Sequence, residues 1–304
     1  MAKKYSLAAF AALFTILFIS CSKGWEAQKP VYLSIPEILL NTDYVSEGTS
    51  NSKITTVWIY ANGDAVGVFE LPCVVPAIVN EGNNEITMYA GINLNGIAAS
   101  RAIYEGFEAM DFTLNYSPSG QADADTILID AANRVTSYTS RVTVNLVETF
   151  DGAGLNFEKS NISDTNLRKT DANDPNNFVN LQDTSENSGR AGILYTSKSK
   201  DLAEVVSVKA LQLPGGGSNV YLEMNYKCNV PFIVGVIADV NGSDFQQPTL
   251  YITPKSEWNK IYVNLVTEVS SVTNANGYKI YFRADHDDNL DTGKVYLDNL
   301  KLVY

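Results

Sequence analysis

Histidine, cysteine and positive charge are scarce in this 304-residue sequence. The single histidine, His286, excludes a His-based catalytic triad or a multi-histidine metal centre formed by this chain alone. The three cysteines are not spaced as a zinc or redox motif. Lysine and arginine number 22 against 34 aspartate and glutamate residues, a net charge of −12. Because nucleic-acid phosphates require basic surfaces, this charge balance argues against nucleic acid as a partner.

No catalytic constellation stands out either. Glycoside hydrolysis needs two carboxylates that face each other across a cleft, and the sequence singles out no such pair. His286 lies in the polar turn Asp285–Asp291, where proton transfer in a closed pocket is not expected. We therefore expect a protein that is not an enzyme.

The first 21 residues have the pattern of a secretory signal. Lys3 and Lys4 precede an apolar run from Leu7 to Ile19, which is shorter than the roughly 20 apolar residues that span a bilayer. The run ends in Phe18-Ile19-Ser20-Cys21, which resembles the lipobox of bacterial lipoproteins, with phenylalanine where leucine is usual. An ordinary signal peptide with an incidental cysteine is the alternative.

The lipobox resemblance implies where the protein is located. It makes residues 1–20 a signal peptide, Cys21 the lipidated N-terminus and residues 21–30 a tether. Ser22 follows the cysteine, so the acidic residue that often retains lipoproteins in the inner membrane is absent. We therefore expect a lipid anchor in the outer membrane, on either the periplasmic or the cell-surface face.

Strand signals fill the first half of the chain, and helix signals are almost absent. Ile54–Tyr60 is rich in β-branched and aromatic residues, and Asn62-Gly63 follows it as a strong hairpin signal. Val66–Leu71 would be the returning strand. Short strands separated by turn residues predict a β-sandwich domain over residues 31–146, which resembles small Ig-like or PEGA-like surface modules.

Residues 147–304 are expected to form a second domain. The polar stretch 160–188 is too long for an ordinary connection and is either a functional loop or partly disordered. Strands are then expected over 191–195, 205–209, 220–226, 232–237, 249–253, 259–265, 278–282 and 295–303. Eight strands with almost no helix predict a jelly roll, so the whole chain is predicted to be all-β, with two β-sandwich domains.

Three segments of the second domain resemble a known family. Glu148-Thr149-Phe150-Asp151 resembles the opening strand of carbohydrate-binding modules and galactose-binding-type β-sandwiches. Trp258–Leu265 resembles their penultimate strand region, and Val295–Leu302 resembles their last strand. The resemblance implies non-catalytic binding of a glycan.

The same resemblance implies one cofactor. An acidic residue near the last strand of such modules often joins one near the first strand in a structural calcium site, and Asp298 and Asp151 stand at those places. Calcium bound there would stabilise the fold and would perform no chemistry. The alternative is that Asp298 and Asn299 hold a neighbouring loop by hydrogen bonds.

Sugar binding uses aromatic rings stacked on the pyranose face, with polar side chains contacting the hydroxyls. Several aromatic residues lie in or beside alternating strands, where core or cross-strand packing is expected: Trp58, Tyr60, Tyr221, Tyr251, Trp258, Tyr262 and Tyr281. The rings near loop segments, Phe178, Tyr195 and Phe245, are the candidate ligand-binding residues.

These observations together predict a lipid-anchored protein of the cell envelope that binds a glycan through its C-terminal jelly roll. The alternative is a structural or accessory lipoprotein subunit that contacts an envelope protein in an outer-membrane complex. An aromatic-lined concave face would favour glycan binding, and a large exposed apolar patch would favour the accessory role.

Overall fold

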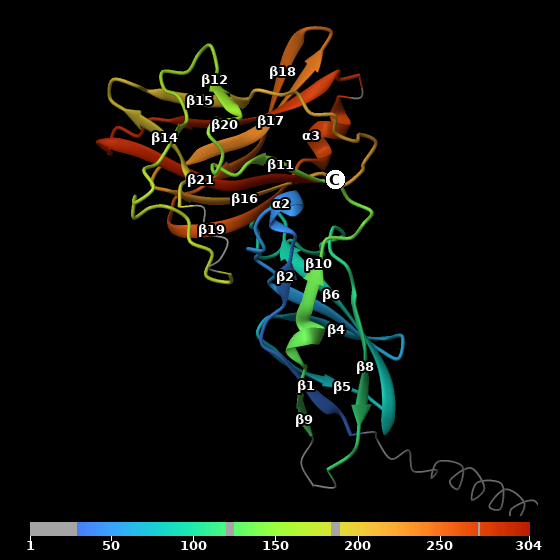
Figure 1. Cartoon of the computed structure of the whole chain (residues 1–304). Helices are drawn as coiled ribbons and strands as arrows, with labels where there is room; N and C mark the ends of the chain where they lie inside the picture. Colours follow the sequence, from blue (N-terminus) through green and yellow to red (C-terminus); the bar gives the residue numbers. More distant parts are fainter. Residues whose placement is uncertain (1–28, 120–124, 184–188, 273) are drawn as a thin grey trace, which may run out of the picture.

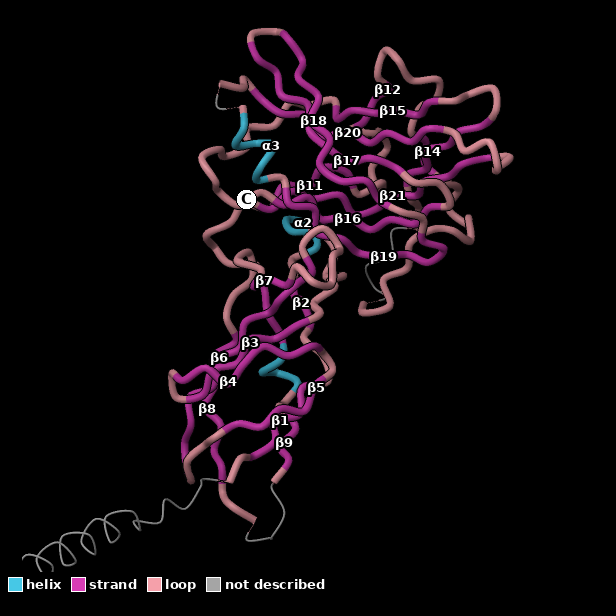
Figure 2. The backbone as a smooth tube through the Cα atoms, turned by 180° about the vertical axis from the view of Figure 1, so that it is seen from behind, coloured by secondary structure: helices cyan, strands magenta, loops and turns pink. Residues whose placement is uncertain are grey.

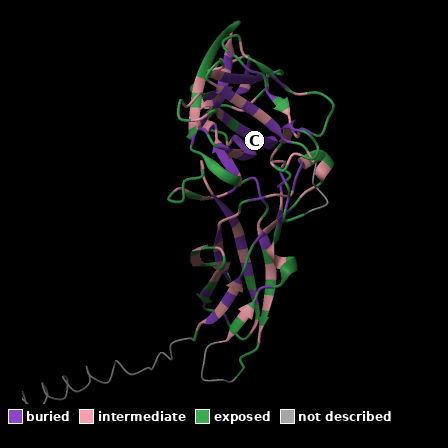
Figure 3. Cartoon of the chain, turned by 90° about the vertical axis from the view of Figure 1, so that its left-hand side faces the viewer, coloured by how far each residue is buried: buried purple, intermediate pink, exposed green. Residues whose placement is uncertain are grey.

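The computed structural model describes residues 29–119, 125–183, 189–272 and 274–304. The predicted signal peptide and Cys21 lie outside these residues. The molecule is elongated, with residues 31–137 in its lower part and residues 144–303 in its upper part (Figure 1). Two clusters of buried apolar side chains form the cores of the two parts. Buried and exposed positions alternate along many strands (Figure 3), as expected for sheets that bury one face.

The lower part is built from short strands. Its elements are β1 (Val31–Ile35), β2 (Leu39–Asn41), α2 (Tyr44–Glu47), β3 (Thr56–Ala61), β4 (Asp64–Glu70), β5 (Cys73–Ala77), β6 (Gly82–Asn93), β7 (Arg101–Ile103), β8 (Met110–Tyr116), β9 (Thr126–Leu128), η1 (Ala131–Arg134) and β10 (Val135–Ser137). One sheet has the order β4-β3-β6-β7 with β8 beside β6, a second has the order β5-β1-β9, and β2 pairs with β10. The predicted β-rich fold is confirmed for this part.

The hairpin predicted at Asn62-Gly63 is confirmed. Strand β3 pairs with β4 in antiparallel register, and Asn62 and Gly63 connect them with φ angles of 53° and 85°. Two consecutive positive φ angles are the requirement of the two-residue turn that matches the twist of paired strands. Asparagine and glycine adopt this conformation at low cost, which explains why the chain reverses here.

The upper part is a β-sandwich. Its elements are β11 (Val144–Glu148), β12 (Phe157–Lys159), β13 (Arg168–Lys169), β14 (Gly192–Ser197), β15 (Leu202–Ser207), β16 (Tyr221–Cys228), β17 (Phe232–Val240), β18 (Ser243–Ile252), β19 (Lys255–Asn264), α3 (Val266–Ser271), β20 (Gly277–Asp285) and β21 (Thr292–Val303). Each of the eight strand segments predicted for residues 191–303 overlaps one of these strands.

Two sheets form this sandwich. The first, here called the inner sheet, has the order β13-β14-β21-β16-β19 with β11 beside β21. The second, here called the distal sheet, has the order β12-β15-β20-β17-β18. Core side chains come from both sheets, for example Leu222 and Leu302 from the inner sheet and Val234 and Phe282 from the distal sheet. The all-β sandwich fold predicted from the sequence is therefore confirmed.

The two parts of the molecule meet at the inner sheet. Strand β11 pairs with β21 along Val144–Glu148, so the predicted domain boundary at residue 147 falls inside this strand and stays a prediction. Tyr221, Tyr262 and Val303 of the upper strands belong to the buried cluster of the lower part. The backbone tube in Figure 2 shows the lower strands extending away from this junction, with the distal sheet on the opposite side of the sandwich.

Candidate functional site

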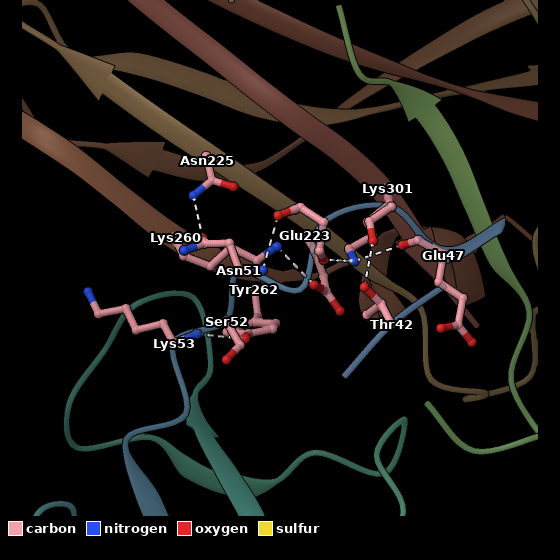
Figure 4. Close-up of polar contacts among 12 residues, drawn as sticks. Thr42, Glu47, Asn51, Ser52, Lys53, Glu223, Asn225, Lys260, Tyr262 and Lys301 are labelled. Carbon is pink, nitrogen blue, oxygen red and sulfur yellow. Dashed lines mark hydrogen bonds and ion pairs between the residues drawn. The ribbon is translucent and has the colours of Figure 1, made fainter. Parts of the chain in front are cut away.

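The outer face of the inner sheet is covered by the lower part of the molecule. At the centre of the contact is Glu223 on β16, which is fully buried. Its Oε1 atom accepts hydrogen bonds from the hydroxyls of Tyr104 at 2.8 Å and Tyr138 at 2.9 Å, both from the lower part. Its Oε2 atom lies 3.0 Å from Nζ of Lys260 on β19. The two parts are therefore joined by a buried, charged network (Figure 4).

In this network, the effect of burial on the charge of Glu223 is opposed by nearby positive charges. Burial alone would raise the pKa of Glu223, but the ammonium groups of Lys260 and Lys301, with the Tyr104 hydrogen bond, hold that pKa below its ordinary value. Burial, and then the charge of Glu223, raises the pKa values of Tyr104 and Tyr138 well above their ordinary range. The carboxylate therefore stays ionised and the phenols stay protonated, which is the state that their hydrogen bonds require.

Lys301 on β21 fixes the segment that follows α2. Its Nζ atom donates to the backbone carbonyls of Glu47 at 2.9 Å and Thr49 at 3.0 Å, while the ammonium lies 4.8 Å from the centre of the Tyr138 ring. The side chain of Asn225 donates to that of Asn51 at 2.7 Å (Figure 4). These specific polar contacts hold the lower part in one orientation on the inner sheet.

A loop covers another area of the same face. Part of the polar stretch predicted at 160–188 lies here, with residues 184–188 outside the described residues. Phe178 packs edge-on against Trp258 of β19 with ring centres 5.4 Å apart, and the indole Nε1 of Trp258 donates to the carbonyl of Asn176 at 3.0 Å. The inner sheet is thus covered by its own loop and by the lower part.

The distal sheet presents the other outer face, which lies at the end of the molecule farthest from β1 (Figure 1). Alternation on β17 sends Phe232, Val234, Val236 and Ala238 into the core. The residues between them face outward, and Ile233 and Ile237 are only half-buried. The sandwich therefore has one covered face and one open face.

In the middle of the distal sheet, the ring of a buried tyrosine packs against a glycine. Tyr281 on β20 pairs across the sheet with Gly235 on β17. A Cβ atom at Gly235 would lie 2.7 Å from the Tyr281 ring and 2.2 Å from the carbonyl oxygen of Gln247. Only glycine fits at position 235. Because it has no side chain, the Tyr281 ring can pack against the backbone there.

Two polar side chains meet over the Tyr281 ring. The Gln246 amide of β18 donates to Oε2 of Glu204 on β15 at 2.9 Å. Strands β20 and β17 lie between these two strands, a separation of roughly 14 Å in a flat sheet at the usual strand spacing. Because the side chains nevertheless touch, the face must be concave. They leave Tyr281 only 1% exposed.

Two hollows lie on this face, and both residues of the bridge line the second of them. The first, of about 380 Å³, is lined by residues that include Ile233, Tyr251, Arg283, Asp285 and His286. The second, of about 450 Å³, is lined by residues that include Glu158, Asn161, Asp244 and Lys279. Tyr251 is 62% exposed, the largest exposed fraction among the aromatic residues of the described chain.

Each of the two hollows contains one ion pair. Nη2 and Nε of Arg283 donate to the two carboxylate oxygens of Asp285 at 2.8 Å and 3.3 Å, and Lys279 lies 4.0 Å from Glu158. The Asp285 hydrogen bond raises the pKa of Arg283. An exposed ring beside planar, oriented donors and acceptors is suited to a ligand that has an apolar face and many hydroxyls.

The sequence-predicted ligand residues lie in different places. Phe178 is 7% exposed under the loop of the inner sheet. Tyr195 lies on β14, with Arg168 4.3 Å from its ring centre and Lys200 donating to its hydroxyl at 2.8 Å, a hydrogen bond that lowers the pKa of Tyr195. Phe245 lies on β18 of the distal sheet and is 51% exposed. No aromatic contact joins the three rings within the described residues.

Other residues of the open face were not singled out by the sequence. Core or cross-strand packing was expected for Tyr251 and Tyr281; Tyr281 is buried, but Tyr251 is mostly exposed. One signal was available, the glycine that interrupts the apolar strand Phe232–Ile237 at Gly235, since a glycine inside a strand often marks the close approach of another group.

The predicted calcium residues lie near the junction of the two parts. Asp298 on β21 is fully buried; Oδ1 accepts from the backbone N–H of Asn299 at 2.7 Å, and Oδ2 has no hydrogen-bond partner among the described residues. Burial raises the pKa of Asp298 well above its ordinary value, and the charges of Asp151 and Glu148 add to this effect. Asp151 accepts a hydrogen bond from the Tyr44 hydroxyl at 2.9 Å.

This arrangement fits a cation only in part. A buried carboxylate with one unpartnered oxygen needs either a proton or a positive charge beside it. Both oxygens of Glu148, however, already accept backbone N–H groups, from Phe150 at 2.8 Å and Asn156 at 2.7 Å. Within the described residues, no group of three histidine, cysteine or acidic side chains is placed to hold a metal ion. Asp298 and Asp151 would therefore need backbone carbonyls or water to complete a calcium site.

Within the part of the chain that is described, no helix has the length and apolar character needed to cross a membrane.

No protein-family model matches this chain, and no curated protein matches it either. Three solved structures resemble part of it. A family 29 carbohydrate-binding module is 11% identical, with 54% of this chain and 89% of the module covered and a TM-score of 0.33. The CBM22-1 and GH10 modules of Clostridium thermocellum xylanase 10B, in complex with xylohexaose, are 15% identical over 54% of this chain, with a TM-score of 0.36. The enzymatically active domain of bacteriophage CBA120 tailspike protein 4 is 13% identical over 52% of this chain, with a TM-score of 0.38. The chain covers 28% of the xylanase structure and 21% of the tailspike structure.

Proposed function

We propose that this chain is a non-catalytic glycan-binding protein of the bacterial cell envelope, and that it binds its ligand on the outer face of the distal sheet. The observation that carries the proposal is the contrast between the two sheets. The inner sheet is covered, whereas the distal sheet leaves a concave face with two hollows, one lined by the exposed ring of Tyr251 and the other by the Glu204–Gln246 bridge. Ring faces bind the apolar side of a sugar, and oriented amides and carboxylates bind its hydroxyls.

A binding role is supported over catalysis by the state of three carboxylates on this face. Asp285 is paired with Arg283, Glu158 lies beside Lys279, and Glu204 accepts a hydrogen bond from Gln246. Glycoside hydrolysis needs one acid that keeps a proton and a second that is free to attack or to activate water. Carboxylates held in such pairs are suited to fixing hydroxyl groups in place.

The proposal includes a lipid on Cys21, which would place the protein in the outer membrane. The first described residues enter β1 at the end of the molecule opposite the distal sheet (Figure 1). With a lipid at the N-terminus, the lower part would act as a spacer that holds the binding face away from the membrane. Replacement of Cys21 by alanine should then release the protein from the membrane fraction, whereas Cys73→Ala should not.

We also propose a structural calcium ion at Asp298 and Asp151. Its support is the buried, unpartnered oxygen of Asp298. Calcium should raise the melting temperature of the wild-type protein and a chelator should reverse the effect, because a ligand that binds only the native state stabilises it. Asp298→Asn should abolish the calcium response, whereas Asp64→Asn in the distant β3–β4 hairpin should keep it. If the melting temperature of the wild-type protein is the same with calcium and with a chelator, the calcium site is excluded.

The experiment that tests the function is a glycan-array screen of residues 22–304, run with calcium and with a chelator. Saturable binding to one polysaccharide class would support the proposal, and Gln246→Ala should then weaken binding to that class. The absence of binding in both conditions would overturn the proposal and favour the accessory-subunit alternative. A crosslinked pull-down from membranes would then identify the envelope protein that it contacts.

A further inference from the structure

A third hollow of the size of a ligand site lies where the two parts of the molecule meet, on the covered side of the sandwich. This junction hollow has a volume of about 500 Å³ and is lined by Tyr89 and Phe107 below, by Asn219, Tyr221 and Tyr304 above, and by Arg141 in the segment that connects the two parts. Small-molecule sites have volumes of about 300–1,000 Å³ and occur preferentially at domain interfaces. The C-terminus lies at this junction in Figure 1.

The walls of the junction hollow are aromatic and fixed in place. Phe107 and Tyr221 are each 5% exposed, and both pack against Tyr104, with ring centres 4.5 Å and 4.9 Å away. Tyr104 in turn donates to the buried carboxylate of Glu223. Rings held by a buried network cannot close over the space between them, so the hollow is a preformed feature of the docked molecule.

The rim supplies polar groups of two kinds. The Asn219 amide donates to the Glu105 carboxylate at 2.5 Å, which ties the upper part to the lower part beside the opening. Nε of Arg141 donates to the Thr139 hydroxyl at 3.3 Å. Within the described part of the chain, no acidic side chain is paired with Arg141. Its guanidinium is therefore a cation at the mouth of an aromatic hollow, in a chain whose net charge is −12.

We propose that the junction hollow binds a small amphipathic organic anion, with an aromatic or apolar body against the half-buried rings of Tyr89 and Tyr304 and one acidic group on Arg141. The charges set the orientation of the ligand, because Glu105 repels the anionic end and Arg141 attracts it. The hollow lies on the opposite side of the sandwich from the distal sheet, so this site is separate from the proposed glycan face. Its occupant would contact both parts of the molecule at once.

The test uses 8-anilinonaphthalene-1-sulfonate, an aromatic anion that fluoresces when it leaves water, titrated into residues 22–304. We expect saturable binding at one site. Arg141→Gln should weaken this binding by about fivefold, the effect of a partly exposed charge pair, and Arg141→Lys should restore most of it. Lys198→Gln makes the same charge change on an exposed residue outside the hollow and should leave binding unchanged. Arg141 is exposed, so these variants are expected to fold.

A competition experiment tests the chemical class of the ligand. Naphthalene-1-sulfonate should displace the probe, whereas 1-naphthol, which has the same rings without the strong acid, should displace it much less. The wild-type melting temperature should rise with the anion, since binding to the native state stabilises it. Non-saturable fluorescence, or binding that Arg141→Gln leaves intact, would overturn the proposal. Dimerisation of the protein through the junction hollow would also overturn the proposal, because a second copy of the chain would then occupy the hollow.

Discussion

The two outer faces of the sandwich have the same alternating strand pattern, but one face is covered by the rest of the chain and the other is open to solvent. On the inner sheet, Glu223 and Lys260 face outward and are buried by a second part of the chain. On the distal sheet, Lys279 and Arg283 also face outward, and they border open hollows. The alternation of side chains along a strand determines which of them point away from the core. Whether those side chains are exposed to solvent depends on which other part of the chain packs over them. The predictions below test this difference, beginning with the largest expected effect.

Removing the central carboxylate of the covered face should have the largest effect. Glu223→Ala leaves Lys260 and Lys301 buried without their anion, and breaking a buried ion pair costs about 3–5 kcal/mol. The measurement is urea unfolding of residues 22–304. The matched control is Glu70→Ala, which removes the exposed partner of Arg101 and should cost at most about 1 kcal/mol. Equal losses in the two variants would contradict the assignment of Glu223 as the centre of the junction.

A methyl group on the open face should have the next largest effect. Gly235→Ala places a Cβ against the Tyr281 ring and the Gln247 carbonyl, and such overpacking costs about 1–3 kcal/mol. Displacement of Tyr281 should also weaken any ligand bound on this face. Gly154→Ala is the control, because nothing lies within 4 Å of the added Cβ there. A Gly235→Ala protein with unchanged unfolding and unchanged ligand binding would show that the ring does not lie on Gly235.

The charge pattern of the open face should govern which glycans bind. Arg283 is engaged by Asp285, so its guanidinium is not free to pair with a uronic acid. Asp285→Asn should free that guanidinium and raise the affinity for polygalacturonate by about fivefold, as judged by affinity electrophoresis. Asp291→Asn removes the same charge from the neighbouring turn and should have a smaller effect. A wild-type preference for polygalacturonate over uncharged polysaccharides would contradict this prediction.

The smallest expected effect is a pH dependence of the covered face. The pKa of Glu223 is held below its ordinary value of 4.5 in the folded protein. Its contribution to stability is therefore complete above about pH 4.5 and is lost as the pH falls through the lowered, folded-state pKa. Between about pH 6 and about pH 3, Glu223→Gln should lose less unfolding free energy than the wild type. If the unfolding free energies of the two proteins change with pH in parallel, the ionised Glu223 carboxylate makes no such contribution to stability.

The sequence predicts the fold well because the relevant signals are local. Alternation locates the strands of the sandwich, and Asn62-Gly63 locates a hairpin, since both depend on backbone geometry within a few residues. The location of Tyr251 on the exposed edge strand β18 depends on which strands neighbour it, and local alternation does not contain that information. The same alternation therefore predicts packing for Tyr251 and for Tyr281, although only Tyr281 is buried.

The site is harder to predict because it depends on what covers each face. Glu223 and Lys260 have the sequence pattern of surface residues, and only the docked lower part buries them. Phe178 comes from a polar loop and looks available for a ligand, but the loop folds onto Trp258. Asp298 was singled out by family resemblance, and the structure adds that its Oδ2 atom is buried without a partner in the described residues.

The most direct test of the central claim compares an aromatic residue from each sheet. Calorimetric titration with the polysaccharide found on the array would be performed on the wild type, Tyr251→Ala and Tyr195→Ala. If the open face is the binding face, Tyr251→Ala should lower the affinity by about tenfold, the value of a lost aromatic stacking contact, and Tyr195→Ala should bind as the wild type does. Loss of binding in Tyr195→Ala with an unaffected Tyr251→Ala would contradict the account and move the site to the inner sheet.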